Sequence, residues 1–319
     1  MLKPVLGWLA PAGARARLSI LIFHRVLPRP DPFFPHEIDA SQFDEICGWL
    51  AAWFNVLPLD DALRRLQAGQ LPPRACAITF DDGYADNHGV ALPILERHRL
   101  SATFFIATGF LDGGRMWNDT VIEAVRRSSQ SQLDLYGVPG TGEGTLSLGG
   151  VEQRRVAIHT LIEKLRYLPP LQRREATERL AEVAGVSPPT DLMMTSSQVK
   201  AMRRAGMQIG AHTVSHPILA SLDAATARQE ILGSKETLES LLGERIGLFA
   251  YPNGKPGADY SLETVALARA AGFDAALSTA WGAAEITSDP FQIPRFTPWD
   301  RSRLRFGLRM AANLRRKTT

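Results

Sequence analysis

The chain has 319 residues, of which 45% are hydrophobic and 22% charged, an ordinary globular composition that supplies a large core. Its two cysteines, Cys47 and Cys76, are too few for a disulfide framework or a sulfur-rich metal site, and we expect both to be buried thiols. No apolar run approaches the ~20 residues of a membrane-spanning helix, and the N-terminal apolar patch is broken by Pro4 and Gly7. We therefore expect a cytoplasmic protein, and export by an unrecognised route is the alternative.

The formal net charge of +3 hides an uneven distribution. Residues 301–319 carry seven Arg or Lys residues and no acid, so the other 29 of the 36 basic residues face 33 acidic ones. A body that is slightly acidic does not favour nucleic acid as a partner. The apolar residues of this tail either pack a helix on the body, the more common case, or make peripheral contact with an anionic membrane (Leu304, Phe306, Leu308 and Leu314).

Strand and helix patterns alternate along most of the chain. Continuous apolar runs predict strands covered on both faces at 18–23, 75–80, 102–107, 207–211, 247–250, 275–277 and 291–293. Helical patterns lie between them at 41–54, 60–68, 223–242 and 260–271. A further helical pattern follows the strand at 75–80 and ends at about residue 98. This alternation predicts a parallel α/β sheet, and the length suits a single barrel domain over residues 1–319.

Residues 112–192 interrupt this alternation. A Gly-rich loop at 137–150 precedes charged amphipathic helices at about 151–184, which Pro169 and Pro170 interrupt. We interpret this segment as a helical insertion. Its Gly140–Gly144 run neither follows a strand nor opens a helix, so it is not a dinucleotide-binding loop.

Polar side chains follow four of the predicted strands directly. They are His24, the pair Asp81 and Asp82, His212, and the run Tyr251-Pro252-Asn253. In a parallel barrel these strand ends open on one face, where catalytic groups gather. The sequence therefore predicts an active site at this face.

Two of these groups suit a metal centre. Two adjacent carboxylates stay ionised only beside a cation or hydrogen-bond donors, so Asp81 and Asp82 followed by Gly83 suit one ligand and one proton acceptor. His212 and His216 are close enough in sequence to reach one ion. With Asp82 they form a two-histidine, one-carboxylate set that leaves positions open for water and substrate.

The motifs that contain these residues are recognisable. The runs Thr79-Phe80-Asp81-Asp82-Gly83 and His212-Thr213-Val214-Ser215-His216 resemble the first two motifs of the polysaccharide deacetylases, the NodB-homology members of carbohydrate esterase family four. The run 250–254 resembles the third motif, and the resemblance covers about 18–111 and 193–300. It implies a distorted (β/α)7 barrel that removes acetyl groups from N-acetylhexosamine units of a polysaccharide or of its lipid-linked precursor.

The resemblance also implies roles for individual residues. Asp82, His212 and His216 would bind a divalent metal, most often zinc in this family, and Asp81 would be the general base. A backbone N–H at Tyr251 would help to hold the oxyanion.

The sequence departs from the family pattern in two places. An Arg that commonly precedes the third motif's Pro is missing, and Arg295 is a candidate to replace it as the partner of the base. The late His that usually acts as general acid is also missing, and His24, a metal-bound water or protonated Asp81 are candidates for that role. Two alternatives therefore stay open: an O-acetyl esterase, and a weakened glycan-binding protein.

Overall fold

The structure is a computed structural model that describes residues 2–297 and 300–316. Its contacts divide the chain into two compact units. The first contains the chain up to Arg29, the segment His36–Leu111 and the chain from Met194 onward. The second contains Pro30–Pro35 and Asp112–Met193, so it includes the segment expected as an insertion.

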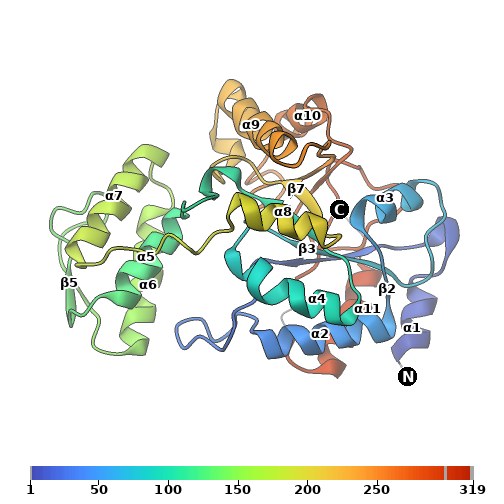
Figure 1. Cartoon of the computed structure of the whole chain (residues 1–319), viewed down its shortest axis with the longest axis horizontal. Helices are drawn as coiled ribbons and strands as arrows, with labels where there is room; N and C mark the ends of the chain where they lie inside the picture. The colour runs from blue at the N-terminus through green and yellow to red at the C-terminus, as the bar shows by residue number, and fades with distance from the viewer. Residues whose placement is uncertain (1, 298–299, 317–319) are drawn as a thin grey trace. The chain divides into compact units, whose positions relative to one another are not determined.

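A seven-stranded parallel sheet forms the centre of the first unit (Figure 1). Its order is β1-β3-β4-β7-β8-β9, and β2 pairs with β3. Every residue of β1, β3 and β4 is buried, as their continuous apolar runs predict. The strand bounds are β1 Ser19–Phe23, β2 Asn55–Val56, β3 Ala75–Phe80, β4 Thr103–Ile106, β7 Gln208–Ala211, β8 Leu248–Ala250 and β9 Ala275–Leu277.

The segment from Ile293 to Phe296 joins the two outer strands of this sheet. Ile293 bridges to Leu277 of β9, and Phe296 bridges to Leu21 of β1, both in parallel orientation. The Phe296 carbonyl accepts a hydrogen bond of 3.0 Å from the N–H of Ile22. The sheet is therefore curled into the distorted barrel that the sequence predicts, although the expected strand at 291–293 is only a bridging segment.

Eight α-helices of the described residues belong to the first unit. They are α1 Leu2–Leu9, α2 Ala40–Trp53, α3 Leu59–Gln67, α4 Leu92–His98, α8 Ser196–Arg204, α9 Ala224–Leu242, α10 Leu262–Ala270 and α11 Arg303–Arg315. A π-helical turn, Asn87–Ala91, precedes α4, and short 3₁₀ turns lie at Gly13–Arg15, Thr108–Phe110 and Leu219–Ser221. The N-cap of α2 is Asp39, whose carboxylate accepts from the N–H of Gln42, so the helix begins one residue before the predicted range 41–54.

The basic tail forms helix α11. Phe306, Met310 and Leu314 are buried in the core of the first unit, so the tail packs its apolar side on the body of the protein. Residues 317–319 of the tail lie outside the described residues. None of the described helices has the length and apolar character needed to cross a bilayer.

The second unit has its own hydrophobic cluster, formed mainly by its three helices. These helices are α5 Trp117–Arg127, α6 Val151–Leu165 and α7 Pro170–Val183, with a hairpin of β5 Gln132–Asp134 and β6 Thr145–Ser147. The helical pattern breaks before Pro170, as predicted, because proline cannot continue a helix but is tolerated at its first position.

Candidate active site

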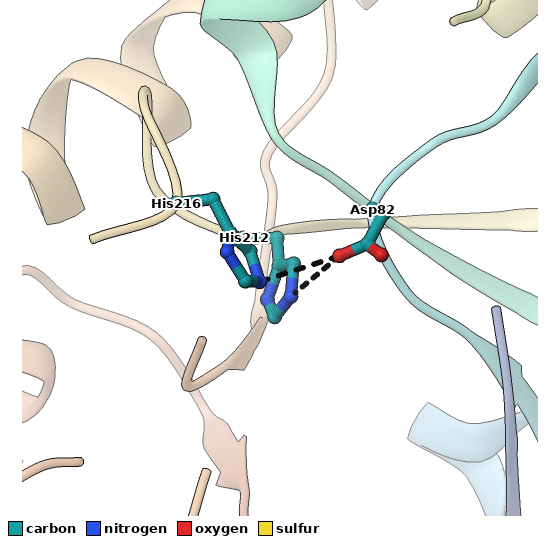
Figure 2. Close-up of side chains that lie close together, drawn as sticks. All are labelled: Asp82, His212 and His216. Carbon is teal, nitrogen blue, oxygen red and sulfur yellow. Dashed lines mark ion pairs between the residues drawn. The ribbon is translucent and has the colours of Figure 1, made fainter. Parts of the chain in front are cut away.

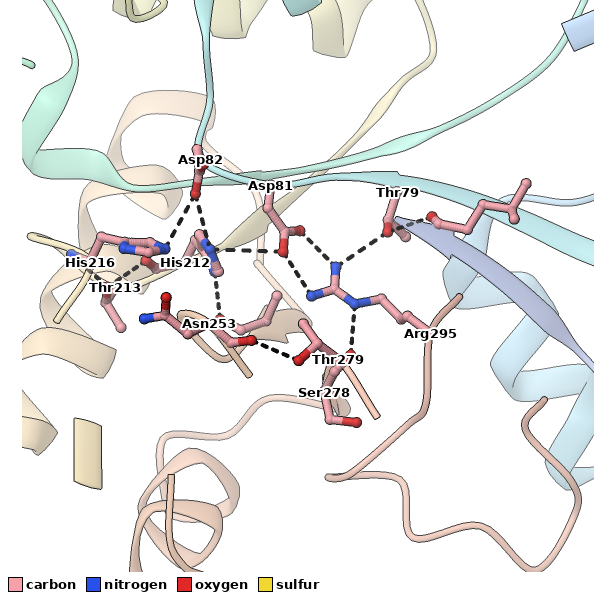
Figure 3. A network of polar contacts seen from close by, with 12 residues as sticks. Thr79, Asp81, Asp82, His212, Thr213, His216, Asn253, Ser278, Thr279 and Arg295 are labelled. Atoms are coloured by element: carbon pink, nitrogen blue, oxygen red, sulfur yellow. Dashed lines mark hydrogen bonds and ion pairs between the residues drawn. The ribbon is translucent and has the colours of Figure 1, made fainter. Parts of the chain in front are cut away.

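The polar residues at the strand ends do meet at one place (Figure 3). Asp81 and Asp82 follow β3, His212 follows β7, and Arg295 comes from the segment that joins β9 to β1. All four side chains are buried. Buried charged groups are expensive unless they are paired, so their grouping points to a functional site.

Asp82, His212 and His216 form one compact set of ligand atoms (Figure 2). Asp82 Oδ1 lies 3.4 Å from His212 Nε2 and 3.3 Å from His216 Nε2. Ligands held at about 2.0–2.1 Å around a tetrahedral zinc are about 3.3–3.4 Å apart, the same as these two separations. Asp82 Oδ1 is buried and has no hydrogen-bond partner, so the three residues fit a divalent cation.

The orientation of His212 also suits a ligand. Its Nδ1 lies 2.7 Å from the carbonyl oxygen of Ala250 on β8. A proton on Nδ1 donates to that carbonyl, which leaves the Nε2 lone pair directed at Asp82.

The two histidines differ in their affinity for a proton in the metal-free chain. Burial lowers the pKa of His212, but the nearby carboxylates of Asp81 and Asp82 raise it more, so the net shift is upward. Burial dominates at His216 and lowers its pKa to about 4. His216 is therefore a neutral imidazole at neutral pH, the form that binds metals.

The backbone at the ligand set is strained. Asp82 has φ of +77° and His216 has φ of +54°, values that non-glycine residues rarely adopt. Thr213, at φ of +66°, accepts a hydrogen bond of 3.1 Å from the N–H of His216. Such strain persists only where the surroundings enforce it, and it concentrates at functional sites.

Glu230 of α9 holds the loop between the two histidines. Its Oε2 accepts from the backbone N–H groups of Val214 at 2.9 Å and Ser215 at 2.8 Å, and its Oε1 accepts from the Ser215 hydroxyl at 2.6 Å. The sequence carries no signal for this role, because nothing in a helical pattern distinguishes Glu230 from a solvated glutamate.

Arg295 makes a two-pronged contact with Asp81. Its Nη1 and Nη2 lie 2.7 Å from Asp81 Oδ1 and Oδ2 respectively. Nε donates to the carbonyl of Ser278 at 2.9 Å, and Nη1 also reaches the hydroxyl of Thr79 at 3.3 Å. The guanidinium is 0% exposed, and this contact is the one for which Arg295 was a candidate.

The same contact keeps Asp81 ionised. Burial raises the pKa of Asp81, but the charges of Arg295 and His212 lower it more, and the net shift is downward. Asp81 Oδ2 also lies 3.9 Å from His212 Nε2, so an ionised carboxylate sits beside the ligand set.

His24 lies at the exit of β1, close enough for its charge to lower the pKa of both Asp81 and Asp82, although other groups contribute more. Its side chain is exposed, so a substrate can reach it. Its backbone carbonyl accepts from Asn87 Nδ2 at 2.9 Å, and the N–H of Val26 donates to Asp86 at 3.1 Å. The pair Asp86 and Asn87 thus fixes the loop that carries His24.

Tyr251 does not have the role expected from the sequence. Its backbone N–H donates to the carbonyl of Leu277 at 3.1 Å as part of the sheet, so it is not available to hold an oxyanion. Its ring is buried and stacks on Tyr260, with ring centroids 4.0 Å apart, and its hydroxyl donates to the Phe291 carbonyl. Tyr251 is a structural residue, and the oxyanion prediction for it is wrong.

The chain also matches a known protein family. The model of the family described as polysaccharide deacetylase matches residues 68–132 and 173–276, more than half of the chain. The chain therefore belongs to the polysaccharide deacetylase family, hydrolases that cleave amide bonds of acetylated glycans.

Individual relatives are distant in sequence. YxkH of Bacillus subtilis, a protein named for the same family, is 21% identical over 282 residues that cover 88% of this chain and 71% of YxkH. The solved structure of IcaB from Ammonifex degensii superposes with a TM-score of 0.60 at 18% identity, covering 95% of this chain and 98% of that one. The Streptococcus pyogenes deacetylase PplD, in complex with acetate, gives a TM-score of 0.59 at 19% identity and covers 88% and 92%. At these identities the structures establish the shared fold.

Proposed function

We propose that this protein is a divalent-metal-dependent hydrolase that removes acetyl groups from N-acetylhexosamine units of a polysaccharide or of its lipid-linked precursor. The observation that carries the proposal is the convergence of Asp82, His212 and His216 on one point, with ionised Asp81 beside them. We propose zinc as the metal, because nitrogen and carboxylate ligands at these separations suit its tetrahedral geometry. When bound, the cation would acidify water and polarise the acetyl oxygen.

Asp81 is the general base of this proposal. Its carboxylate stays ionised at neutral pH and accepts the proton of the attacking water. Arg295 holds both carboxylate oxygens, so it fixes the direction in which Asp81 accepts the proton. The arrangement positions the base without any contribution from the third motif, where the family's usual arginine is missing.

The departing amine needs a proton, and we propose His24 as its donor. No His follows His216 in the sequence, and Pro294 and Arg295 occupy the region where the family usually has one. His24 is the exposed imidazole whose charge acts on both Asp81 and Asp82. His24 follows β1 and Asp81 follows β3, so the proposed donor and the base come from neighbouring strands.

The missing late His also supports a second candidate, O-acetyl ester hydrolysis. An alkoxide leaves more readily than an amine anion, so an esterase needs less help from a general acid. The solved relative from Aggregatibacter actinomycetemcomitans, which is named a de-N-acetylase and gives a TM-score of 0.57, supports the amide reaction.

An acetate-release assay tests the proposal. The purified chain is freed of metal, resupplied with zinc, cobalt or nickel, and offered N-acetylglucosamine oligomers and O-acetylated sugars. We expect acetate from the N-acetyl substrates only with metal, and none from the His216→Ala variant. His159→Ala, at an exposed position of α6, is the matched control and should behave as the parent chain. Release from O-acetyl sugars alone would replace the proposal with the esterase, and no release from either would contradict both.

A further inference from the structure

Helix α11 leaves two large apolar side chains in solvent. Leu304 is 63% exposed and Leu308 is 54% exposed, and the two lie four residues apart on one side of the helix. The opposite side already packs on the core through Phe306, Met310 and Leu314. The helix is therefore apolar toward the protein and also carries apolar groups toward solvent.

Helix α1 packs against α11 and adds to this exposed surface. A Cβ built on Gly307 of α11 would lie 2.5 Å from Leu2 of α1, so the two helices are in close contact. On α1, Trp8 is 81% exposed and Val5 is also exposed. Exposed apolar side chains therefore occur on both of these packed helices.

The charges of this surface have one sign. Every charged residue of α11 is an arginine, and Lys3 is the charged residue of α1. The nearby acid Asp300 is already paired with Arg309 at 3.0 Å. We call the exposed set of Val5, Trp8, Leu304, Leu308, Lys3, Arg305 and Arg315 the helix-pair patch.

We propose that the helix-pair patch binds the surface of an anionic lipid membrane. Exposed leucine and tryptophan side chains enter the boundary between headgroups and acyl chains, while arginine and lysine contact anionic headgroups. A nucleic acid would use the positive charges but leave the leucines in water. A second copy of the chain would bring like charges together. An anionic lipid surface is the partner that can contact both the apolar and the basic side chains of the patch.

Vesicle sedimentation of the full chain tests this proposal. We expect binding to phosphatidylcholine vesicles that contain phosphatidylglycerol, weak binding to phosphatidylcholine alone, and release by salt. The pair Leu304→Gln and Leu308→Gln should weaken binding at least about tenfold, because buried apolar area drives insertion. The pair Arg305→Glu and Arg315→Glu should weaken it to a similar degree.

Two matched controls separate the patch from exposure in general. Leu262→Gln changes a leucine of α10 that is 78% exposed, and Arg174→Glu reverses an exposed arginine of α7. Both should bind vesicles as the parent chain does. All variants should retain the parent's circular dichroism, and because neither readout involves acetate release, the vesicle result does not depend on the deacetylase proposal. No binding to anionic vesicles, equal binding to neutral ones, or binding unchanged by both patch variants would overturn the proposal. Self-association that the leucine variant abolishes would do so as well.

Discussion

The ion pairs at the two ends of the parallel sheet differ in how deeply they are buried. At the carboxyl ends of the strands, Asp81 and Arg295 form a pair that is almost completely buried. At the amino ends, Arg203 pairs with Glu244 and Arg245 with Asp274, and all four side chains remain substantially exposed. A cavity of about 450 Å³ opens among these amino-end residues and contains none of the catalytic groups.

This difference shows where the molecule gives up stability for function. An exposed ion pair costs little to form and contributes little, because water screens it. A buried pair carries a desolvation cost that good geometry only offsets, so removing one partner leaves a charge that nothing compensates. The presence of a cavity therefore does not mark the catalytic end of this sheet, whereas buried, paired charge does.

The largest effect on acetate release is expected for Asp81, the proposed general base. Asp81→Asn keeps the size of the side chain but removes the proton acceptor, so acetate release should fall by about 10²–10⁴-fold. The matched change at the other end, Asp274→Asn, should leave the rate within about twofold, since it alters an exposed pair. Steady-state kinetics on an N-acetylglucosamine oligomer measure both. Full activity of Asp81→Asn would remove Asp81 from the mechanism.

A similar comparison applies to folding stability. Arg295→Met leaves the Asp81 carboxylate buried without its partner and should lower the free energy of unfolding by about 3–5 kcal/mol. Arg245→Met, at the amino end, should cost only about 0–1 kcal/mol. Urea denaturation of the two variants measures the difference. Adding Asp81→Asn to Arg295→Met should recover part of the loss, and equal losses for the two single variants would contradict the comparison.

A smaller effect, on zinc affinity, is expected for Glu230, which holds the loop between His212 and His216. Glu230→Gln keeps one oxygen that can accept from the N–H groups of Val214 and Ser215, but it removes the negative charge, so these hydrogen bonds become weaker. Zinc affinity should weaken by about 10–100-fold. Glu239→Gln is the control, because it lies on the same helix and accepts from Ile246 N–H near the amino ends of the strands. A chelator competition assay should leave the control unchanged, and unchanged affinity in Glu230→Gln would reduce Glu230 to a packing role.

The smallest effect is the expected change of zinc affinity with pH. The pKa of His212 is raised in the metal-free chain, so a cation must displace its proton at any pH below that pKa. Zinc affinity should then fall by about tenfold for each pH unit below it. His216, with its pKa lowered to about 4, adds no further proton near neutrality. A pH series of the same competition assay measures the slope, and a flat profile would show that His212 carries no proton to displace.

The sequence by itself predicted the parallel sheet, the break in the helices before Pro170 and the residues of the candidate site at the strand ends. These are local properties, since an apolar run that stops at a polar residue identifies both a strand and the face on which it opens. Helix α8 was missed, although its Thr195 and Gln198 form a capping box. Short amphipathic segments give a weaker signal than continuous apolar runs.

Only the tertiary structure decided which distant groups hold the site in place. Arg295 lies 214 residues from Asp81 in the chain, and it reaches the carboxylate because the segment that carries it bridges β9 to β1. Tyr251 has the right position in sequence, yet its N–H already belongs to the sheet. Local pattern fixes which chemical groups a strand delivers, whereas the pairing of strands far apart in sequence determines which of their atoms remain available to react.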